Sequence, residues 1–305
     1  MSATNFDLIV IGTGVTGLAA AKQAAQKGVK TATVESLMFG GLVININELE
    51  PAPPGDQTSG TELASTLMME ASELGVESIN ETATGLTREG DVCVVTTDGG
   101  AYRARAVIVA TGAKLKRLGV PGELDFEGRG VSQCADCDGP MYKDEDVVVV
   151  GGGDSALQEA IVLSTYCKRV HLVHRGTQYR AQQHLMDAVA SHANIKPVWN
   201  TVVESVTGEQ TVNKVRVRDL GSNARREIPC AGFFAYIGLE PACDFVPAEI
   251  KRDEAGFLVA DATLSTAMSG VYAAGAARAG FGGMLTDALA DAQTAAKAVC
   301  GALGK

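Results

Sequence analysis

The hydrophobic pattern of the chain repeats one unit twice. In each copy an apolar strand runs into a glycine-rich loop, a segment with helical spacing follows, and a second apolar strand comes next. This order predicts two β-α-β units and therefore an α/β fold. The first copy has its strands at 6–11 and 30–34, and the second has strands at 147–150 and 170–174 around a helix at about 155–166.

The remaining residues predict short strands, two further helices and irregular connections. Continuous apolar runs are typical of buried strands, and alternation of apolar and polar residues is typical of half-buried strands. Runs of glycine, proline and asparagine predict loops. The expected strands lie within 76–109, 202–234 and 270–274, the helices at 61–74 and about 284–299, the irregular stretch at 40–60, and the connections at 114–130 and 238–247.

Length and composition limit the classes of function. The chain of 305 residues suits two domains, and its formal net charge of −10 disfavours nucleic acid and anionic membranes as partners. Residues 1–5 lead directly into a strand without a charged segment, so we expect no signal peptide. No stretch reaches the roughly 18 apolar residues of a membrane span. Seven cysteines, mostly widely spaced, favour a reducing compartment, so we expect a cytoplasmic location.

The first glycine loop contains Gly12, Gly14 and Gly17 between a strand and a helix. In such a loop the first glycine permits a tight turn, the second lets the backbone approach a pyrophosphate, and the third lets the helix pack against the strand. Glu35 ends the next strand, where a carboxylate suits a ribose 2′-hydroxyl and would repel a 2′-phosphate. The pattern predicts a dinucleotide site, and a tight turn without a ligand is the alternative.

The second glycine loop is Gly151-Gly152-Gly153-Asp154-Ser155-Ala156, with alanine in the third small position. The strand after its helix ends in His174-Arg175, Arg180 follows closely, and no carboxylate stands at the place of the first unit's acid. Positive groups here favour a 2′-phosphate and so predict NADPH rather than NADH. A solvated basic turn is the alternative.

Cys134 and Cys137 form a single Cys-x-x-Cys pair between the two loops. Such a pair is either a two-electron redox couple or half of a zinc site, which needs four ligands. The histidines lie in one later stretch, and His171 and His174 are expected on opposite faces of a strand, which is poor chelating geometry. We therefore expect a redox pair and no metal. Asp138 is the candidate acid or base for the thiols, with a helix-cap or turn aspartate as the alternative.

Together these motifs resemble the low-molecular-weight thioredoxin reductases. Residues 131–139, Val-Ser-Gln-Cys-Ala-Asp-Cys-Asp-Gly, resemble the redox motif of that family, and 151–156 resemble its NADPH loop. His174-Arg175 with Arg180 is similar to its 2′-phosphate motif. Two short stretches, Gly40-Gly41 and Ala110-Thr111-Gly112, are similar to its flavin-domain signatures. The resemblance covers nearly the whole chain in the order of the family.

The resemblance implies two Rossmann-like dinucleotide-binding domains in a homodimer. It implies an FAD-binding domain of residues 1–114 and 240–305. An NAD(P)H-binding domain of residues 115–239, which carries the dithiol, is inserted into it. Both the dithiol and the nicotinamide must reach the same flavin in turn, so the inserted domain is expected to rotate about hinges near 114–119 and 238–241.

The resemblance also implies an electron path and its residues. NADPH reduces FAD, Cys137 faces the flavin, and Cys134 attacks the disulfide of thioredoxin, a thioredoxin-like protein or a small disulfide. The residues implied for FAD are Gly12, Thr13, Gly14, Thr16, Gly17, Glu35, Gly40, Gly41, Asn47, Ala110, Thr111, Gly112, Gly275, Ala276, Gly283 and Met284. The residues implied for NADPH are Gly151, Gly153, Asp154, Ser155, Ala156, His174, Arg175 and Arg180.

The chain departs from the pattern of the family at three places. Gly176 stands where a second arginine is usual, so NADH can compete with NADPH. Ala276 replaces an aspartate that normally hydrogen-bonds the ribityl chain, at a cost of about 0.5–1.5 kcal/mol. Gly282-Gly283-Met284 stands where arginine and glutamine are usual, although a helix N-terminus there can still stabilise negative charge on a reduced flavin.

Two other functions stay open at this point. A flavin-dependent dithiol oxidase would run the path backwards and pass electrons to oxygen or another acceptor. The altered residues around Ala276 and Gly282 motivate the oxidase hypothesis, while the complete nicotinamide loop favours the reductase. A flavin-bearing redox sensor with little turnover is the third reading.

Overall fold

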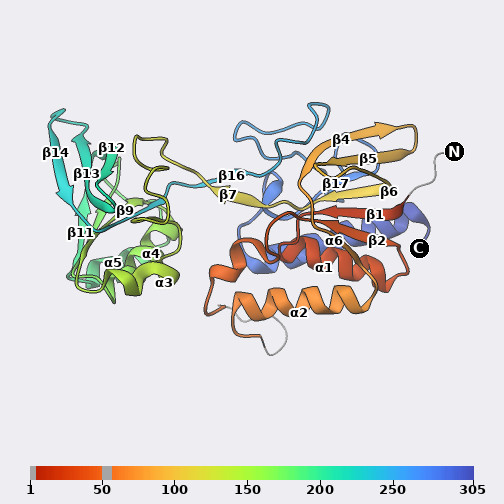
Figure 1. Ribbon diagram of the computed structural model, residues 1–305, viewed down its shortest axis with the longest axis horizontal. Helices are drawn as coiled ribbons and strands as arrows, with labels where there is room; N and C mark the ends of the chain where they lie inside the picture. Colours follow the sequence, from red (N-terminus) through yellow and green to blue (C-terminus); the bar gives the residue numbers. More distant parts are fainter. Residues whose placement is uncertain (1–4, 50–56) are drawn as a thin grey trace. The chain divides into compact units, whose positions relative to one another are not determined.

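The computed structural model describes residues 5–49 and 57–305. The chain divides into two compact units (Figure 1), the first made of residues 1–114 and 240–305 and the second of residues 115–239. Both units combine helices with parallel strands, so the predicted α/β class is confirmed. Parts of two predictions, the direct entry of residues 1–5 into a strand and the irregular stretch 40–60, lie outside the described residues.

The first unit is built on a sheet of seven strands in the order β3-β2-β1-β6-β5-β4, with β17 also paired to β6. Strands β1, β2, β3, β6 and β17 run parallel, whereas β4 and β5 join β6 as antiparallel neighbours. The strands are β1 Phe6–Ile11, β2 Thr31–Val34, β3 Glu77–Ile79, β4 Ala83–Glu89, β5 Val92–Thr97, β6 Ala101–Val109 and β17 Val271–Ala273.

Three helices cover one face of this sheet (Figure 1), and α1 packs between its two neighbours. Strand β1 shows how the two faces are filled: Leu8 and Val10 join the core beneath the helices, whereas Ile9 and Ile11 join the core on the other face. This alternation follows from the two-residue period of a strand. The elements are α1 Val15–Gln26, α2 Gly60–Glu73, α6 Leu285–Leu303 and the 3₁₀ turns η1 Gly41–Asn45 and η3 Gly275–Ala277.

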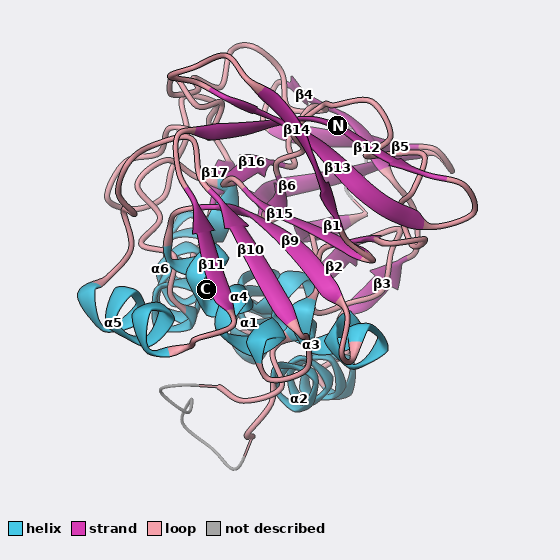
Figure 2. Ribbon diagram, turned by 90° about the vertical axis from the view of Figure 1, so that its left-hand side faces the viewer, coloured by secondary structure: helices cyan, strands magenta, loops and turns pink. Residues whose placement is uncertain are grey.

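The second unit contains a parallel sheet of five strands in the order β11-β10-β9-β15-β8. Figure 2 shows β9, β10 and β11 side by side. Val147 and Val149 of β9 pack toward α4, and Val148 and Val150 pack on the opposite face. The elements are β8 Val131–Ser132, α3 Ala135–Asp138, η2 Gly139–Tyr142, β9 Asp146–Gly151, α4 Asp154–Ser164, β10 Arg169–Val173, α5 Gln183–Ser191, β11 Ile195–Val198 and β15 Gly232–Tyr236.

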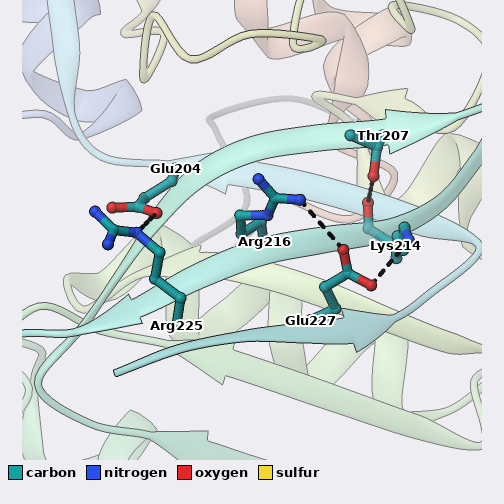
Figure 3. A network of polar contacts seen from close by, with 6 residues as sticks. All are labelled: Glu204, Thr207, Lys214, Arg216, Arg225 and Glu227. Atoms are coloured by element: carbon teal, nitrogen blue, oxygen red, sulfur yellow. Dashed lines mark hydrogen bonds and ion pairs between the residues drawn. The ribbon is translucent and has the colours of Figure 1, made fainter. Parts of the chain in front are cut away.

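An antiparallel sheet of three strands covers that opposite face. Its strands are β12 Thr201–Gly208, β13 Val212–Asp219 and β14 Arg225–Pro229. Valines such as Val215 point into the core, while the other face carries charges (Figure 3). Glu227 pairs with Lys214 at 2.8 Å, and Glu204 pairs with Arg225 at 2.8 Å. Charged side chains on an edge strand such as β14 discourage pairing with another chain.

The two segments that connect the units pair with each other as a short ladder of β7 Ala113–Leu115 and β16 Leu239–Pro241. The predicted connection at 114–130 is therefore partly a strand. The last helix ends four residues later than predicted, at Leu303. The stretch expected to be irregular contains the 3₁₀ turn η1. The helix predicted at 61–74 is confirmed within one residue at each end.

A buried ion pair joins α6 to η3 in the first unit. Asp291 of α6 is 6% exposed and binds Arg278 through both oxygens, at 2.6 Å and 2.8 Å. The same carboxylate accepts a hydrogen bond of 2.8 Å from the Gly275 N–H. Removing one partner of a buried ion pair leaves the other charge without compensation, which is strongly destabilising.

We therefore expect Asp291→Ala to lower the free energy of unfolding by about 3–5 kcal/mol, measured by denaturant titration. Gln293→Ala is the matched control, because Gln293 is exposed on the same helix and its loss should change stability by less than about 0.5 kcal/mol. Equal stability of both variants would show that the ion pair does not hold η3 to α6.

Candidate functional site

The predicted dithiol is a disulfide at the start of α3. The Cα atoms of Cys134 and Cys137 lie 5.3 Å apart. Cys134 is the N-cap residue of the helix, and its Sγ accepts a hydrogen bond of 3.1 Å from the Cys137 N–H. The Cys134 N–H in turn donates to Ser132 Oγ at 3.1 Å. Cys137 is exposed and Cys134 is half-buried, so the pair can be reached from solvent.

Glu159 of α4 is a neighbour of the dithiol that the sequence did not indicate. Its Oε2 accepts a hydrogen bond of 3.1 Å from the Ala135 N–H and one of 3.2 Å from Tyr236 Oη. Burial raises the pKa of the Glu159 carboxyl. The pKa of Tyr236 is also raised, by burial first and by the adjacent carboxylate second. A glutamate inside an ordinary helical pattern carries no motif, so only packing of α4 against α3 reveals it.

Asp138 is the last residue of α3 and is half-buried. Its N–H donates to the Cys134 carbonyl at 3.1 Å, which closes the single turn of the helix. Its side chain makes no capping bond to the following turn η2. Asp138 also occupies the N-cap position of η2, so the structure does not decide between a helix-cap or turn aspartate and the predicted acid or base.

The second glycine loop opens into a cavity of about 860 Å³ within the second unit. A Cβ at Gly151 would overlap the carbonyl oxygen of Tyr236, whereas a Cβ at Gly153 would meet nothing within 4 Å. The loop is thus closed toward the sheet and open toward the cavity, which suits a bound phosphate at the N-terminus of α4. The predicted residues that line the cavity together are Gly151, Gly153, Asp154, Ser155, Ala156, His174, Arg175 and Arg180.

The positive end of this cavity carries two exposed arginines, Arg175 and Arg180. Burial lowers the pKa of His174 against two backbone hydrogen bonds that raise it, and both arginines lower it further. His174 is therefore neutral at pH 7, and the arginines supply the positive charge. Sequence reasoning missed other lining residues, among them Lys116 and Thr201, because they come from segments far from the loop and have no motif of their own.

The first glycine loop brings β1, α1 and the end of β6 into close contact. Gly12 has φ +101°, and a Cβ there would overlap the Ala110 carbonyl. A Cβ at Gly17 would overlap the Gly12 carbonyl. The side-chain oxygens Thr13 Oγ1 and Thr111 Oγ1 are buried without a hydrogen-bond partner in the described part of the chain. Buried hydroxyls without partners and a loop free of side chains fit a bound dinucleotide.

Glu35 stands at the end of β2, as the first loop requires. One of its oxygens accepts a hydrogen bond of 3.3 Å from the Thr13 N–H, and the other accepts one of 3.0 Å from Ser36 and one of 3.1 Å from Leu37. Glu35 and Thr13 line a cavity of about 110 Å³ in the first unit. The Glu35 carboxylate, which is predicted to bind a ribose, is thus hydrogen-bonded to the first glycine loop.

The remaining residues predicted for FAD fall into two groups. Gly14 forms an isolated β-bridge with Gly40. Gly275 lies close to Thr16, because a Cβ added at Gly275 would stand 2.5 Å from the Thr16 hydroxyl oxygen. These residues therefore gather around the first loop, next to Gly41 and Gly112. Asn47, Gly283 and Met284 are exposed and do not line the small cavity, and Ala276 lies in η3.

Neither a metal cluster nor a membrane-spanning helix occurs in the part of the chain that the structure describes. Within residues 5–49 and 57–305, no three His, Cys, Asp or Glu side chains gather into a possible metal site. No helix among the same residues has both the length and the apolar content needed to cross a bilayer.

The chain is similar in sequence to known proteins. The sequence model described as pyridine nucleotide-disulphide oxidoreductase matches residues 6–298. The chain belongs to the pyridine nucleotide-disulphide oxidoreductase family. It is 38% identical to the thioredoxin reductase of Treponema pallidum (strain Nichols) over 277 residues, which are 90% of each chain. This relative confirms the resemblance to thioredoxin reductases that the motifs indicated.

Solved structures of this oxidoreductase family have the same fold. The thioredoxin reductase of Lactococcus lactis in its FR conformation superposes with a TM-score of 0.90 at 31% identity, covering 97% of this chain and 98% of that one. The thioredoxin reductase of T. acidophilum superposes with a TM-score of 0.89 at 29% identity, covering 98% and 99%.

The glycine contacts lead to a prediction for the first loop. We expect Gly17→Ala to lower the unfolding free energy by about 1–3 kcal/mol, because its Cβ overlaps a backbone carbonyl that cannot move away. The dinucleotide retained per purified chain should also fall. Gly301→Ala is the control on α6, where nothing lies within 4 Å, and should stabilise the helix by about 0.5–1 kcal/mol. Full dinucleotide retention in Gly17→Ala would contradict the assigned role of the loop.

Proposed function

We propose that this protein is an NAD(P)H-dependent flavoprotein disulfide reductase that acts on thioredoxin or a thioredoxin-like protein. The Cys134–Cys137 pair would receive the electrons that NADPH supplies and pass them to the disulfide of the partner, and FAD held at the first glycine loop would carry these electrons to the pair. The observation that carries the proposal is a disulfide in the same compact unit as a cavity of about 860 Å³ built on a nucleotide-type glycine loop. The 38% identity to a thioredoxin reductase supports the choice of partner.

The residues around the first loop fit FAD. When bound, FAD would supply a group that can accept hydride from a nicotinamide and pass two electrons to a disulfide. Thr13 and Thr111 offer buried hydroxyls without partners, and the N-terminus of α1 offers N–H groups to the pyrophosphate. Glu35 offers its carboxylate to a ribose hydroxyl. Ala276 offers no side-chain acceptor, and the N–H of its neighbour Gly275 donates to Asp291.

The two cysteines perform the disulfide exchange. The Cys134 thiolate attacks one sulfur of the partner disulfide, so that a mixed disulfide forms and the other partner sulfur leaves as a thiolate. The Cys137 thiolate then attacks Cys134 Sγ, which breaks the mixed disulfide and releases the partner as a dithiol. The Cys134–Cys137 bond re-forms, and two electrons and two protons have moved to the partner. Asp138 is the candidate proton donor for the leaving thiolates.

NADPH is the proposed nicotinamide, because Arg175 and Arg180 supply positive charge at the cavity while His174 is neutral. Gly176 offers no second charge beside Arg175, so NADH competes. The protein is further proposed to be a cytoplasmic homodimer. The five buried free cysteines support a reducing compartment, and the homodimer is what the resemblance of the motifs to the low-molecular-weight thioredoxin reductases implies.

A flavin-dependent dithiol oxidase is the second candidate, and Ala276 with the exposed Gly283 and Met284 favours it. An oxidase takes its electrons from a dithiol and does not need a nicotinamide. The nucleotide cavity of the second unit therefore favours the reductase.

The purified protein assayed with NADPH, FAD and a thioredoxin tests the proposal. We expect NADPH to bleach the flavin and thioredoxin disulfide to reoxidise it with turnover. Bleaching mainly by dithiols with consumption of oxygen would support the oxidase instead, and slow or absent bleaching would support a redox sensor.

Cys134→Ser should abolish thioredoxin reduction in this assay and leave NADPH oxidation by ferricyanide within about twofold, since ferricyanide takes electrons without the dithiol. Cys167→Ser is the control, because Cys167 is buried and free. Thioredoxin turnover by Cys134→Ser at the wild-type rate would rule out the proposed electron path.

Arg175→Ala should raise the KM for NADPH about tenfold or more and leave the KM for NADH within about twofold, because only NADPH carries a 2′-phosphate for the guanidinium. Arg169→Ala is the control, because Arg169 begins the same strand β10 but does not line the cavity. Equal losses for both nicotinamides would argue against a contact with the 2′-phosphate.

A further inference from the structure

The carboxylate of Glu159 lies between the dithiol helix and the nucleotide cavity. It accepts hydrogen bonds from the backbone N–H of Ala135, directly after Cys134, and from the hydroxyl of Tyr236. Tyr236 is 6% exposed at the end of β15 and belongs to the lining of the cavity. Two donors therefore hold the carboxylate in one orientation beside the backbone of Cys134.

The hydrogen bond to Ala135 matters because α3 contains only four residues. The first N–H groups of a helix have no partner within the helix, so they need one from elsewhere. In the disulfide form the Cys137 N–H is satisfied by Cys134 Sγ, and the Ala135 N–H is satisfied by Glu159. When the disulfide opens, Cys134 Sγ is free to move, while the bond from Glu159 to Ala135 can persist.

The hydrogen bonds of Glu159, and not its charge, are what the geometry of the site shows. Burial raises the pKa of the Glu159 carboxyl, and the nearby Asp136 raises it further. A carboxyl group keeps an acceptor oxygen in both its neutral and its ionised form, so the bond from the Ala135 N–H does not depend on the charge.

We propose that Glu159 is a positioning residue of the dithiol, which holds the Cys134–Ala135 backbone through the Ala135 N–H. The inference rests on the proposed disulfide-reductase function and adds a residue that positions the same site. A fixed backbone at Cys134 keeps its sulfur in one place for attack on an external disulfide.

Two substitutions test the hydrogen bond. Glu159→Gln keeps an acceptor oxygen for the Ala135 N–H, whereas Glu159→Ala removes it. Gln158→Ala is the control, since Gln158 is the exposed neighbour on α4. The rate at which iodoacetamide alkylates Cys134 in the reduced protein, followed by mass spectrometry, reports how this thiol is held.

We expect Glu159→Ala to change the alkylation rate of Cys134 by at least about threefold, because it leaves the Ala135 N–H without its acceptor. Glu159→Gln and Gln158→Ala should match the wild type. An alkylation rate of Glu159→Ala equal to that of the wild type would overturn the positioning role.

Hydrogen exchange of the Ala135 amide tests the positioning role. Protection should persist in Glu159→Gln and fall at least tenfold in Glu159→Ala, and equal protection in both would overturn it. None of these measurements needs nicotinamide turnover or flavin. If NADPH failed to reduce the protein, the proposed function would fail while the effect of Glu159 on the dithiol could still be measured.

Discussion

The close approach of a helix N-terminus to the end of a parallel strand is the constraint on which both units depend. In the first unit a Cβ at Gly17 would overlap the Gly12 carbonyl. In the second unit a Cβ at Gly151 would overlap the Tyr236 carbonyl and the Ala156 side chain. A side chain at either position would push the helix from the sheet. The same absence of side chains leaves backbone N–H groups exposed at the helix end, where a pyrophosphate can bind. Packing and binding are therefore served by the same residues.

The dithiol occupies a different kind of position. It lies on one helical turn between β8 and β9, in the same unit as the larger nucleotide cavity. A four-residue helix cannot be stable by itself, so its geometry is set by the disulfide, by Ser132 and by Glu159.

The turn η3 of the first unit is fixed by a carboxylate on a neighbouring helix. Ala276 cannot provide the carboxylate that the resemblance places there. Asp291, buried on α6, holds the neighbouring Gly275 N–H and is neutralised by Arg278. The turn η3 is thereby fixed from the helix side. Ala276 itself is partly exposed and adds no polar group to the turn.

The sequence by itself determined the two β-α-β units, the glycine loops with Glu35 and Arg175 at their expected strand ends, and the Cys134–Cys137 pair. These features are local, because strand period, loop glycines and cysteine spacing are set within short segments. Only the tertiary structure decided that Glu159 meets Ala135, 24 residues away, and that Asp291 meets Gly275, 16 residues away. Such contacts depend on how helices pack against neighbouring elements, and a single glutamate or aspartate in a helical pattern does not reveal which backbone group it will face.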